Sequence, residues 1–110
     1  MQIKDLEILL DSLEYKGKKI PNVYHSFKLN GNEVPSLPYI VYFVDSVDTI
    51  GADNKVAYKE NRYIIELYTK INNTSLEEQI EKLFDDNNIF YEKFEAYIQN
   101  EGMFQIAYHI

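Results

Sequence analysis

Two histidines carry the side chains best suited to catalysis or metal binding at neutral pH. His25 and His109 are the only histidines, and an imidazole can act as a general base or as a metal ligand. Each lies inside a strand pattern without an adjacent acidic pair, whereas a working site needs further groups that orient the imidazole. We therefore expect both histidines to pack against neighbours or to face solvent.

Three aspartates, Asp45, Asp48 and Asp53, lie close together in a stretch that we predict to be a loop. Carboxylate oxygens are ligands for hard cations, but a calcium-binding loop needs ligands at fixed offsets and a Glu further along, which this spacing does not provide. We expect a solvated acidic loop and no metal site.

Glu66 is a charged residue inside an otherwise apolar and aromatic stretch, residues 63–69. In a strand, such a carboxylate has three possible settings: an open face of the sheet, a cross-strand ion pair, or a subunit interface. The candidate partners for an ion pair are Lys93 and Arg62, and such a pair contributes at most about 1 kcal/mol.

Other signatures of chemistry are missing from the chain. It contains no cysteine, which excludes disulfides, thiol catalysis and thiolate metal sites. It also has no glycine-rich phosphate loop and no serine nucleophile motif. The sequence thus predicts no catalytic residue, no metal and no cofactor.

Length and composition predict one folded domain that covers residues 1–110. With 45% hydrophobic residues the chain can bury a core. No apolar run approaches the ~18 residues of a membrane span. The first residues lack the basic start and apolar block of a signal peptide. We expect no membrane association and a cytoplasmic location.

The net charge of −7 disfavours a nucleic-acid-binding surface, because the phosphate backbone is itself anionic. The simpler interpretation of this charge is that it keeps the protein soluble. The alternative is that the negative charge lines a passage through which DNA moves without being bound. The chain also has 10 tyrosines, which suit either half-exposed strands or protein–protein interfaces.

In the first half of the chain, apolar spacing predicts a helix over residues 2–14, stopped by Gly17. A strand is predicted over residues 20–29 and another over residues 39–44. Residues 45–54 are predicted to be a loop or loose hairpin. An extended piece at residues 55–59 and a central strand at residues 62–70 follow.

In the second half, Thr74 and Ser75 each start a capping box, with Glu77 and Glu78, and predict a helix. Its expected buried stripe is Leu76, Ile80, Leu83 and Phe84, and its expected solvent face is Glu77, Glu78, Gln79, Glu81 and Lys82. Residues 89–99 and 103–110 are predicted to form a closing hairpin around Gly102.

This order of elements predicts an α+β fold, with an antiparallel or mixed sheet of four to five strands and two helices packed on one face. Two helices leave part of such a sheet uncovered. The uncovered face is a natural surface for contact with another subunit.

Several stretches resemble a family of small proteins from tailed phages and prophages of Gram-positive bacteria, the tail terminator, tail completion and head–tail joining proteins. The resemblance covers about residues 35–110. It lies in the order and spacing of Leu37-Pro38-Tyr39-Ile40-Val41-Tyr42, Ala52-Asp53-Asn54-Lys55-Val56, Ile65-Glu66-Leu67-Tyr68-Thr69-Lys70 and Met103-Phe104-Gln105-Ile106-Ala107-Tyr108.

The resemblance implies a tail-terminator-like protomer that assembles into a ring, commonly a hexamer, at the head-proximal end of the tail tube. Its partners would be other copies of itself, the major tail tube protein and the head–tail connector protein. DNA would be only passing cargo in the lumen. The protein would act in the virion tail or neck, after assembly in the host cytoplasm. The alternative is a small adaptor or regulatory domain that binds a protein through its open sheet face.

Exposed loops and sheet edges are where neighbours in a ring can meet. We therefore place the subunit and tail-tube contacts on the strand at residues 39–44, on the loop at residues 45–54 and on the central strand. The predicted interface residues are Tyr39, Tyr42, Asp45, Asp48, Asp53, Asn54, Glu66 and Tyr68.

Overall fold

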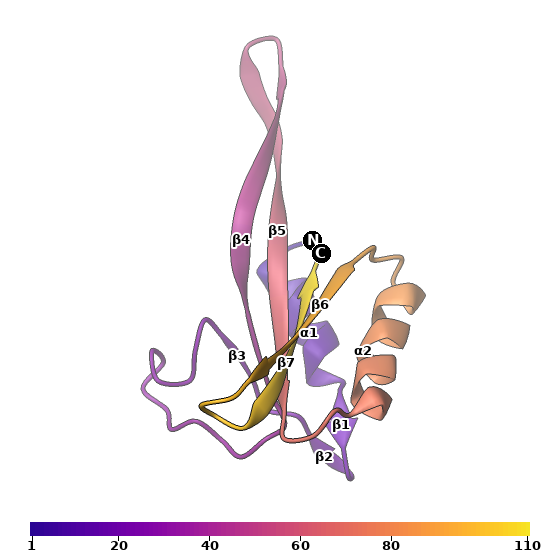
Figure 1. Ribbon diagram of the computed structural model, residues 1–110. Helices are drawn as coiled ribbons and strands as arrows, with labels where there is room; N and C mark the ends of the chain where they lie inside the picture. Colours follow the sequence, from indigo (N-terminus) through magenta and orange to yellow (C-terminus); the bar gives the residue numbers. More distant parts are fainter.

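A long antiparallel hairpin, formed by two neighbouring strands, is the axis of the fold (Figure 1). The computed structural model describes all residues, Met1–Ile110. Its elements, in chain order, are α1 (Ile3–Asp11), β1 (Glu14–Tyr15), β2 (Lys18–Lys19), β3 (Asn22–Tyr24), β4 (Tyr39–Ala52), β5 (Lys55–Thr69), α2 (Thr74–Asp86), β6 (Glu92–Ile98) and β7 (Met103–His109).

The main sheet has five strands in the order β3-β4-β5-β7-β6, so β5 is its central strand, as predicted. Strand β3 runs parallel to β4, and the other neighbours are antiparallel. β1 and β2 form a separate two-stranded sheet. The predicted α+β class with a mixed sheet is confirmed.

One hydrophobic cluster joins both helices to the sheet. Because side chains alternate along a strand, Tyr63, Ile65 and Leu67 of β5 share one face and all enter this cluster. The remaining members are Leu6, Leu10, Leu13, Ile20, Ile40, Tyr42, Leu76, Ile80, Phe84, Ile106 and Tyr108. The other face of the main sheet, which carries Ile64, Glu66 and Tyr68, is called the second face below.

The predicted first helix is too long and its stop is wrong. Helix α1 ends at Asp11, and Gly17 belongs to the turn between β1 and β2. Lys16 and Gly17 have φ of 53° and 78°, which is the left-handed backbone that a two-residue hairpin turn requires.

The predicted strand over residues 20–29 is also shorter in the structure. Only Asn22–Tyr24 is strand, because His25 has a φ of 72° and the chain then turns. The Asn30 side chain donates hydrogen bonds to the carbonyls of Tyr24 and Ser26, both at 2.8 Å. Side-chain amides that bond nearby carbonyls in this way offer the backbone an alternative to a strand ladder.

Helix α2 and the closing hairpin occur where the sequence predicts them. The N-cap of α2 is Asn73, whose side chain accepts a hydrogen bond from the Leu76 amide at 3.2 Å, so the capping boxes expected at Thr74 and Ser75 are wrong. Strands β6 and β7 meet at a turn in which Gly102 has a φ of 61°. Neither helix has the length and apolar composition needed to span a membrane.

Candidate functional site

The projecting part of the β4–β5 hairpin is the first surface on which the predicted interface residues gather. Residues 45–54, predicted to be a loop or loose hairpin, belong to a regular hairpin: β4 continues to Ala52, and only Asp53 and Asn54 form the turn. The loop alternative is therefore wrong. Both turn residues have positive φ, 53° and 63°, as in a two-residue hairpin turn. The pieces expected at residues 55–59 and 62–70 are one strand, β5.

Most of this hairpin extends beyond the rest of the sheet (Figure 1) and accounts for the longest dimension of the molecule, 51 Å. β3 pairs only with residues 40–42 of β4, and β7 only with residues 64–69 of β5. Residues 46–52 and 55–62 therefore pair only with each other. Each has one edge along which no strand lies.

The projecting hairpin, residues 45–62, carries both charged and apolar side chains at its surface. Asp45, Asp48, Asp53 and Asn54 are all exposed, and Asp48 pairs with Arg62 at 2.8 Å. Four large apolar residues are also exposed, namely Val47, Ile50, Val56 and Tyr58. Ile50 and Tyr58 oppose each other, so apolar surface lies on the hairpin with no covering element.

The second face of the sheet brings three more predicted residues together. The ring centroids of Tyr39 and Tyr68 lie 5.2 Å apart. Glu66 accepts a hydrogen bond from the Tyr68 hydroxyl at 3.0 Å and another from the Gln105 amide at 2.9 Å. The expected partners of Glu66, Lys93 and Arg62, are wrong, because both are paired elsewhere.

A groove of about 320 Å³ lies over this cluster, lined also by His25, Phe27 and Met103. Burial raises the pKa of Tyr68 to about 12, and the Glu66 carboxylate beside it acts in the same direction. Burial also raises the pKa of Tyr39. Both phenols are therefore neutral at physiological pH, and the Tyr68 hydroxyl donates its hydrogen bond to Glu66.

Tyr42 does not belong to either surface. Its side chain is 3% exposed and belongs to the hydrophobic core, because its position on β4 puts it on the same face as the core residue Ile40. The prediction that Tyr42 lies at an interface is therefore wrong. A substitution there would change folding before it changed any contact.

The two histidines lie in aromatic surroundings. The His25 ring stacks on Tyr24 with centroids 4.1 Å apart, and His109 lies 4.8 Å from the Phe94 ring. No group of three His, Asp or Glu side chains is arranged to hold a metal ion.

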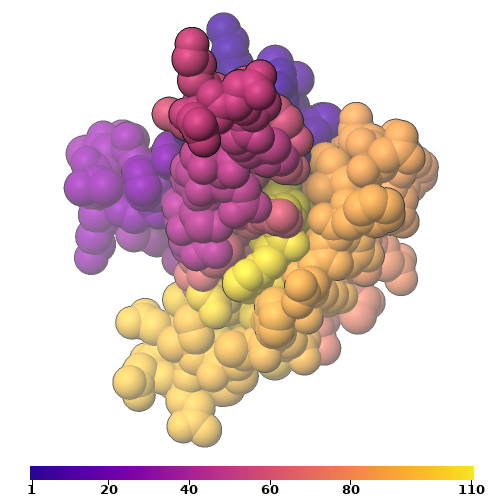
Figure 2. All heavy atoms as spheres, turned by 90° about the horizontal axis from the view of Figure 1, so that it is seen from above, coloured from indigo at the N-terminus to yellow at the C-terminus, as the bar shows by residue number.

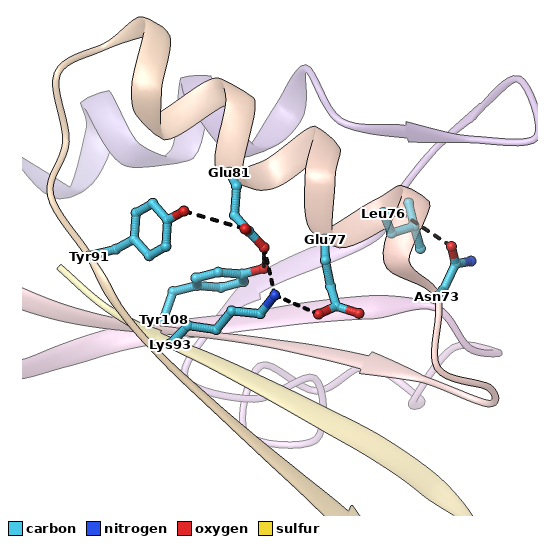
Figure 3. A network of polar contacts seen from close by, with 7 residues as sticks. All are labelled: Asn73, Leu76, Glu77, Glu81, Tyr91, Lys93 and Tyr108. Atoms are coloured by element: carbon cyan, nitrogen blue, oxygen red, sulfur yellow. Dashed lines mark hydrogen bonds and ion pairs between the residues drawn. The ribbon is translucent and has the colours of Figure 1, made fainter.

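A network of charged and phenolic groups between α2 and the β6–β7 edge was not predicted (Figure 3). The Lys93 ammonium lies 2.7 Å from Glu77 and 2.8 Å from Glu81. Tyr108 and Tyr91 donate hydrogen bonds to Glu81 at 2.8 and 3.3 Å. Glu77, expected to face water, is buried, with its side chain 7% exposed. The one available signal was Glu77 and Glu81 at a spacing of four, which puts them on one side of a helix.

The network shifts the pKa values of Glu81, Lys93 and Tyr108. Burial opposes the charge on Glu81, but the hydrogen bonds from Lys93, Tyr108 and Tyr91 outweigh it and lower the pKa of Glu81. Burial likewise opposes the charge on Lys93, but Glu77 and Glu81 outweigh it and raise the pKa of Lys93. Burial and then the bond to Glu81 raise the pKa of Tyr108. The ammonium and the Glu81 carboxylate are thus held charged and the phenol neutral.

The lowered pKa of Glu81 predicts acid sensitivity. Its contribution to stability is complete above the ordinary glutamate value of 4.5 and is lost as pH falls through the lower folded value. We expect the free energy of unfolding to decrease below about pH 4.5, with at most about 1.4 kcal/mol per pH unit from this one proton. Urea unfolding between about pH 3 and 6 measures the slope. Glu81→Gln should flatten it, whereas the exposed Glu78→Gln should not, and equal slopes in all three proteins would contradict the assignment.

Comparison of the chain with protein-family models, with curated proteins and with solved structures found no match. The fold and the two surfaces define the class: a small α+β domain with a projecting hairpin and a partly covered second face. Any more specific function is a proposal.

Proposed function

We propose that this chain is a structural protein of a tailed phage or prophage, which forms a ring at the head-proximal end of the tail tube and joins the tube to the head connector. The ring is commonly a hexamer in the family that the sequence resembles. In this proposal the protein acts by assembly and docking, without catalysis. DNA passes through the lumen. A net charge of −7 is compatible with this role, because an acidic surface does not bind the anionic phosphate backbone.

The observation that carries the proposal is the projecting hairpin. A two-stranded ribbon is marginally stable alone in water, and unpaired strand edges are templates for pairing with another chain. This ribbon has one unpaired edge on each strand and exposes Ile50, Tyr58, Val47 and Val56. Two different edges favour a head-to-tail contact between copies, and head-to-tail contacts close into rings when the rotation allows it.

The family resemblance indicates where such a ring would lie, at the head-proximal end of the tail tube. The stretches that carry it include both ends of the hairpin, Ala52-Asp53-Asn54-Lys55-Val56 at the tip and Ile65-Glu66-Leu67-Tyr68 at the base. We assign Asp45, Asp48, Asp53 and Asn54 of the tip region to contacts with neighbouring subunits or with the tail tube protein.

The test is the mass in solution by light scattering over a wide concentration range, with and without the purified major tail tube protein. We expect a ring-sized species, either alone or only with the tube protein. A shortened variant, in which Asn-Gly replaces residues 48–60, keeps the Val47–Asn61 pair at the end of the ladder and allows a two-residue turn. It should lose every ring-sized species while its far-ultraviolet circular dichroism still shows both helices.

The matched control is Ile8→Asp, because Ile8 is 63% exposed on α1, outside the hairpin. This variant should still form the ring. If the wild-type chain stays small at every concentration and ignores the tube protein, the ring proposal fails.

The second candidate, an adaptor domain, is favoured by the groove over Tyr39, Glu66 and Tyr68. Its lining is mostly apolar with a few polar side chains, as binding sites for ligands usually are. A small species that ignores the tube protein but binds another protein through this groove would support it.

A further inference from the structure

Strand β6 is the outermost strand of the main sheet, and its outer edge has no partner. It pairs only with β7, and residues 92–97 are all exposed. Figure 2, which looks down on the hairpin, places the orange segment that contains β6 on the side opposite the purple segment around residues 25–35. The other edge strand of the sheet, β3, has only 3 residues, so β6 is by far the longer free edge of the two.

Aromatic side chains gather beside this edge. Phe90, just before β6, is 93% exposed, and Phe94 and Tyr97 within β6 are about half exposed. An edge strand is usually protected by charges, proline or a bulge. Strand β6 has no proline, and its pairing with β7 runs without a bulge. Its charges are Glu92, Lys93 and Glu95, which have both signs and so can be paired across a strand contact. A regular edge flanked by three exposed aromatic rings is suited to strand pairing.

We propose that β6 pairs antiparallel with β6 of a second copy of this chain, around a twofold axis that passes beside Phe94. Such an axis is perpendicular to the sheet, so side chains that oppose each other across it point to the same face. Because side chains alternate along a strand, two opposed residues must both have even numbers or both have odd numbers. The axis must therefore pass beside a residue and not between two residues. Each choice of that residue gives a different set of opposed side chains.

The charges of β6 favour one register, because an axis at Phe94 is the only one within β6 that opposes residues of opposite charge. An axis at Glu95 would oppose two carboxylates, and an axis at Lys93 would oppose two ammonium groups, both of which destabilise a strand pair. The axis at Phe94 opposes Lys93 to Glu95 of the second copy, twice, and stacks the two Phe94 rings. It also brings Phe90, two residues before β6, to the end of the second copy's strand near Ile98, where the most exposed aromatic side chain of the molecule could be covered.

The Lys93 ammonium group can form one more hydrogen bond, to Glu95 of the second copy. An ammonium group has three N–H donors, and Glu77 and Glu81 account for two of them. Its side chain is 35% exposed, so the third donor can reach a carboxylate on the neighbouring strand.

This contact is independent of the proposed ring. It uses β6, whereas the ring contact uses the projecting hairpin, which β7 separates from β6 in the sheet. Used alone it produces a closed dimer, because a twofold contact is complete with two copies.

The test exploits the absence of cysteine from the chain. Opposed residues of an antiparallel pair have Cα atoms about 4.5–5.5 Å apart, which is within the range that a disulfide spans. Phe94→Cys should therefore form a covalent dimer under mild oxidation. The matched control is Ala96→Cys on the same exposed strand, since two copies of residue 96 would lie about 14 Å apart. We expect cross-linking of the control to be at least about tenfold slower.

A second variant measures the charge pairing without cross-linking. Glu95→Lys opposes Lys93 to a like charge and should weaken the dimer by about tenfold in Kd, as followed by analytical ultracentrifugation. The shortened-hairpin variant should give the same results, which separates this proposal from the ring. Equal cross-linking at positions 94 and 96, or a monomeric wild-type chain at high concentration, would overturn the proposal.

Discussion

Replacing Lys93 by methionine should lower the free energy of unfolding by about 3 kcal/mol. Methionine keeps the apolar stem of the side chain and removes the ammonium. Glu77 is then left as a carboxylate with a side chain only 7% exposed and without its counterion. Its Oε2 atom already has no hydrogen-bond partner, so no other group can compensate the lost charge.

The matched control is Lys82→Met. Lys82 also forms an ion pair with a carboxylate, Asp86, at 2.8 Å, but those side chains are 74% and 60% exposed. Exposed pairs contribute little to stability, so this variant should be close to the wild type. Urea unfolding at neutral pH compares the two.

A double variant separates the charge from the packing. If the cost of Lys93→Met comes from an unpaired carboxylate, adding Glu77→Gln should recover part of the lost stability, because a neutral amide is less costly to bury than a charge. Equal losses from Lys93→Met and Lys82→Met, or no recovery in the double variant, would show that the network does not depend on this charge.

Replacing Phe84 by alanine should cost about 4 kcal/mol, the largest loss that we expect from a single substitution. Phe84 is 0% exposed at the end of α2, and its ring lies 5.6 Å from the Tyr91 ring and 5.5 Å from the Tyr108 ring. The substitution removes aromatic contacts that join α2 to the start of β6 and to β7. It leaves a cavity that these rings cannot fill without moving.

Phe90→Ala is the control of identical chemistry six positions along the chain. Its ring is 93% exposed, so the loss in a dilute, monomeric sample should stay within about 0.5 kcal/mol. Thermal and urea unfolding of both variants give the comparison. Similar losses at the two positions would mean that burial at Phe84 does not determine its contribution.

Local patterns predicted the elements whose faces differ in polarity. Helix α2 combines an apolar stripe with a polar cap, and in the closing hairpin Ile106 and Tyr108 alternate with Gln105 and His109. In each case the chain's own period matches that of the element. The core positions Leu76, Ile80 and Phe84 were predicted for the same reason and are confirmed.

The same reasoning did not distinguish a loop from a hairpin over residues 45–54, because the outer part of the hairpin has no buried face. Residues 45–52 are mixed in polarity, as is typical of a loop, and they become a strand only because residues 55–62 pair with them. A ladder of cross-strand hydrogen bonds satisfies backbone groups whatever the side chains are. The uniform apolar run at residues 39–44 likewise hides which side chains point inward, and so Tyr42 was misplaced.

By itself, the sequence determined the α+β class, the central place of β5, the second helix and the closing hairpin. It also determined the acidic charge and the candidate residues of the second face. Register was decided only by the tertiary structure. Glu66 aligns with Ala107, and Ala107 with Phe94, so Lys93 projects from the opposite face and cannot reach Glu66. On that face Lys93 forms ion pairs with Glu77 and Glu81. The register of a strand determines which face of the sheet each charged side chain occupies. No local sequence pattern encodes the register.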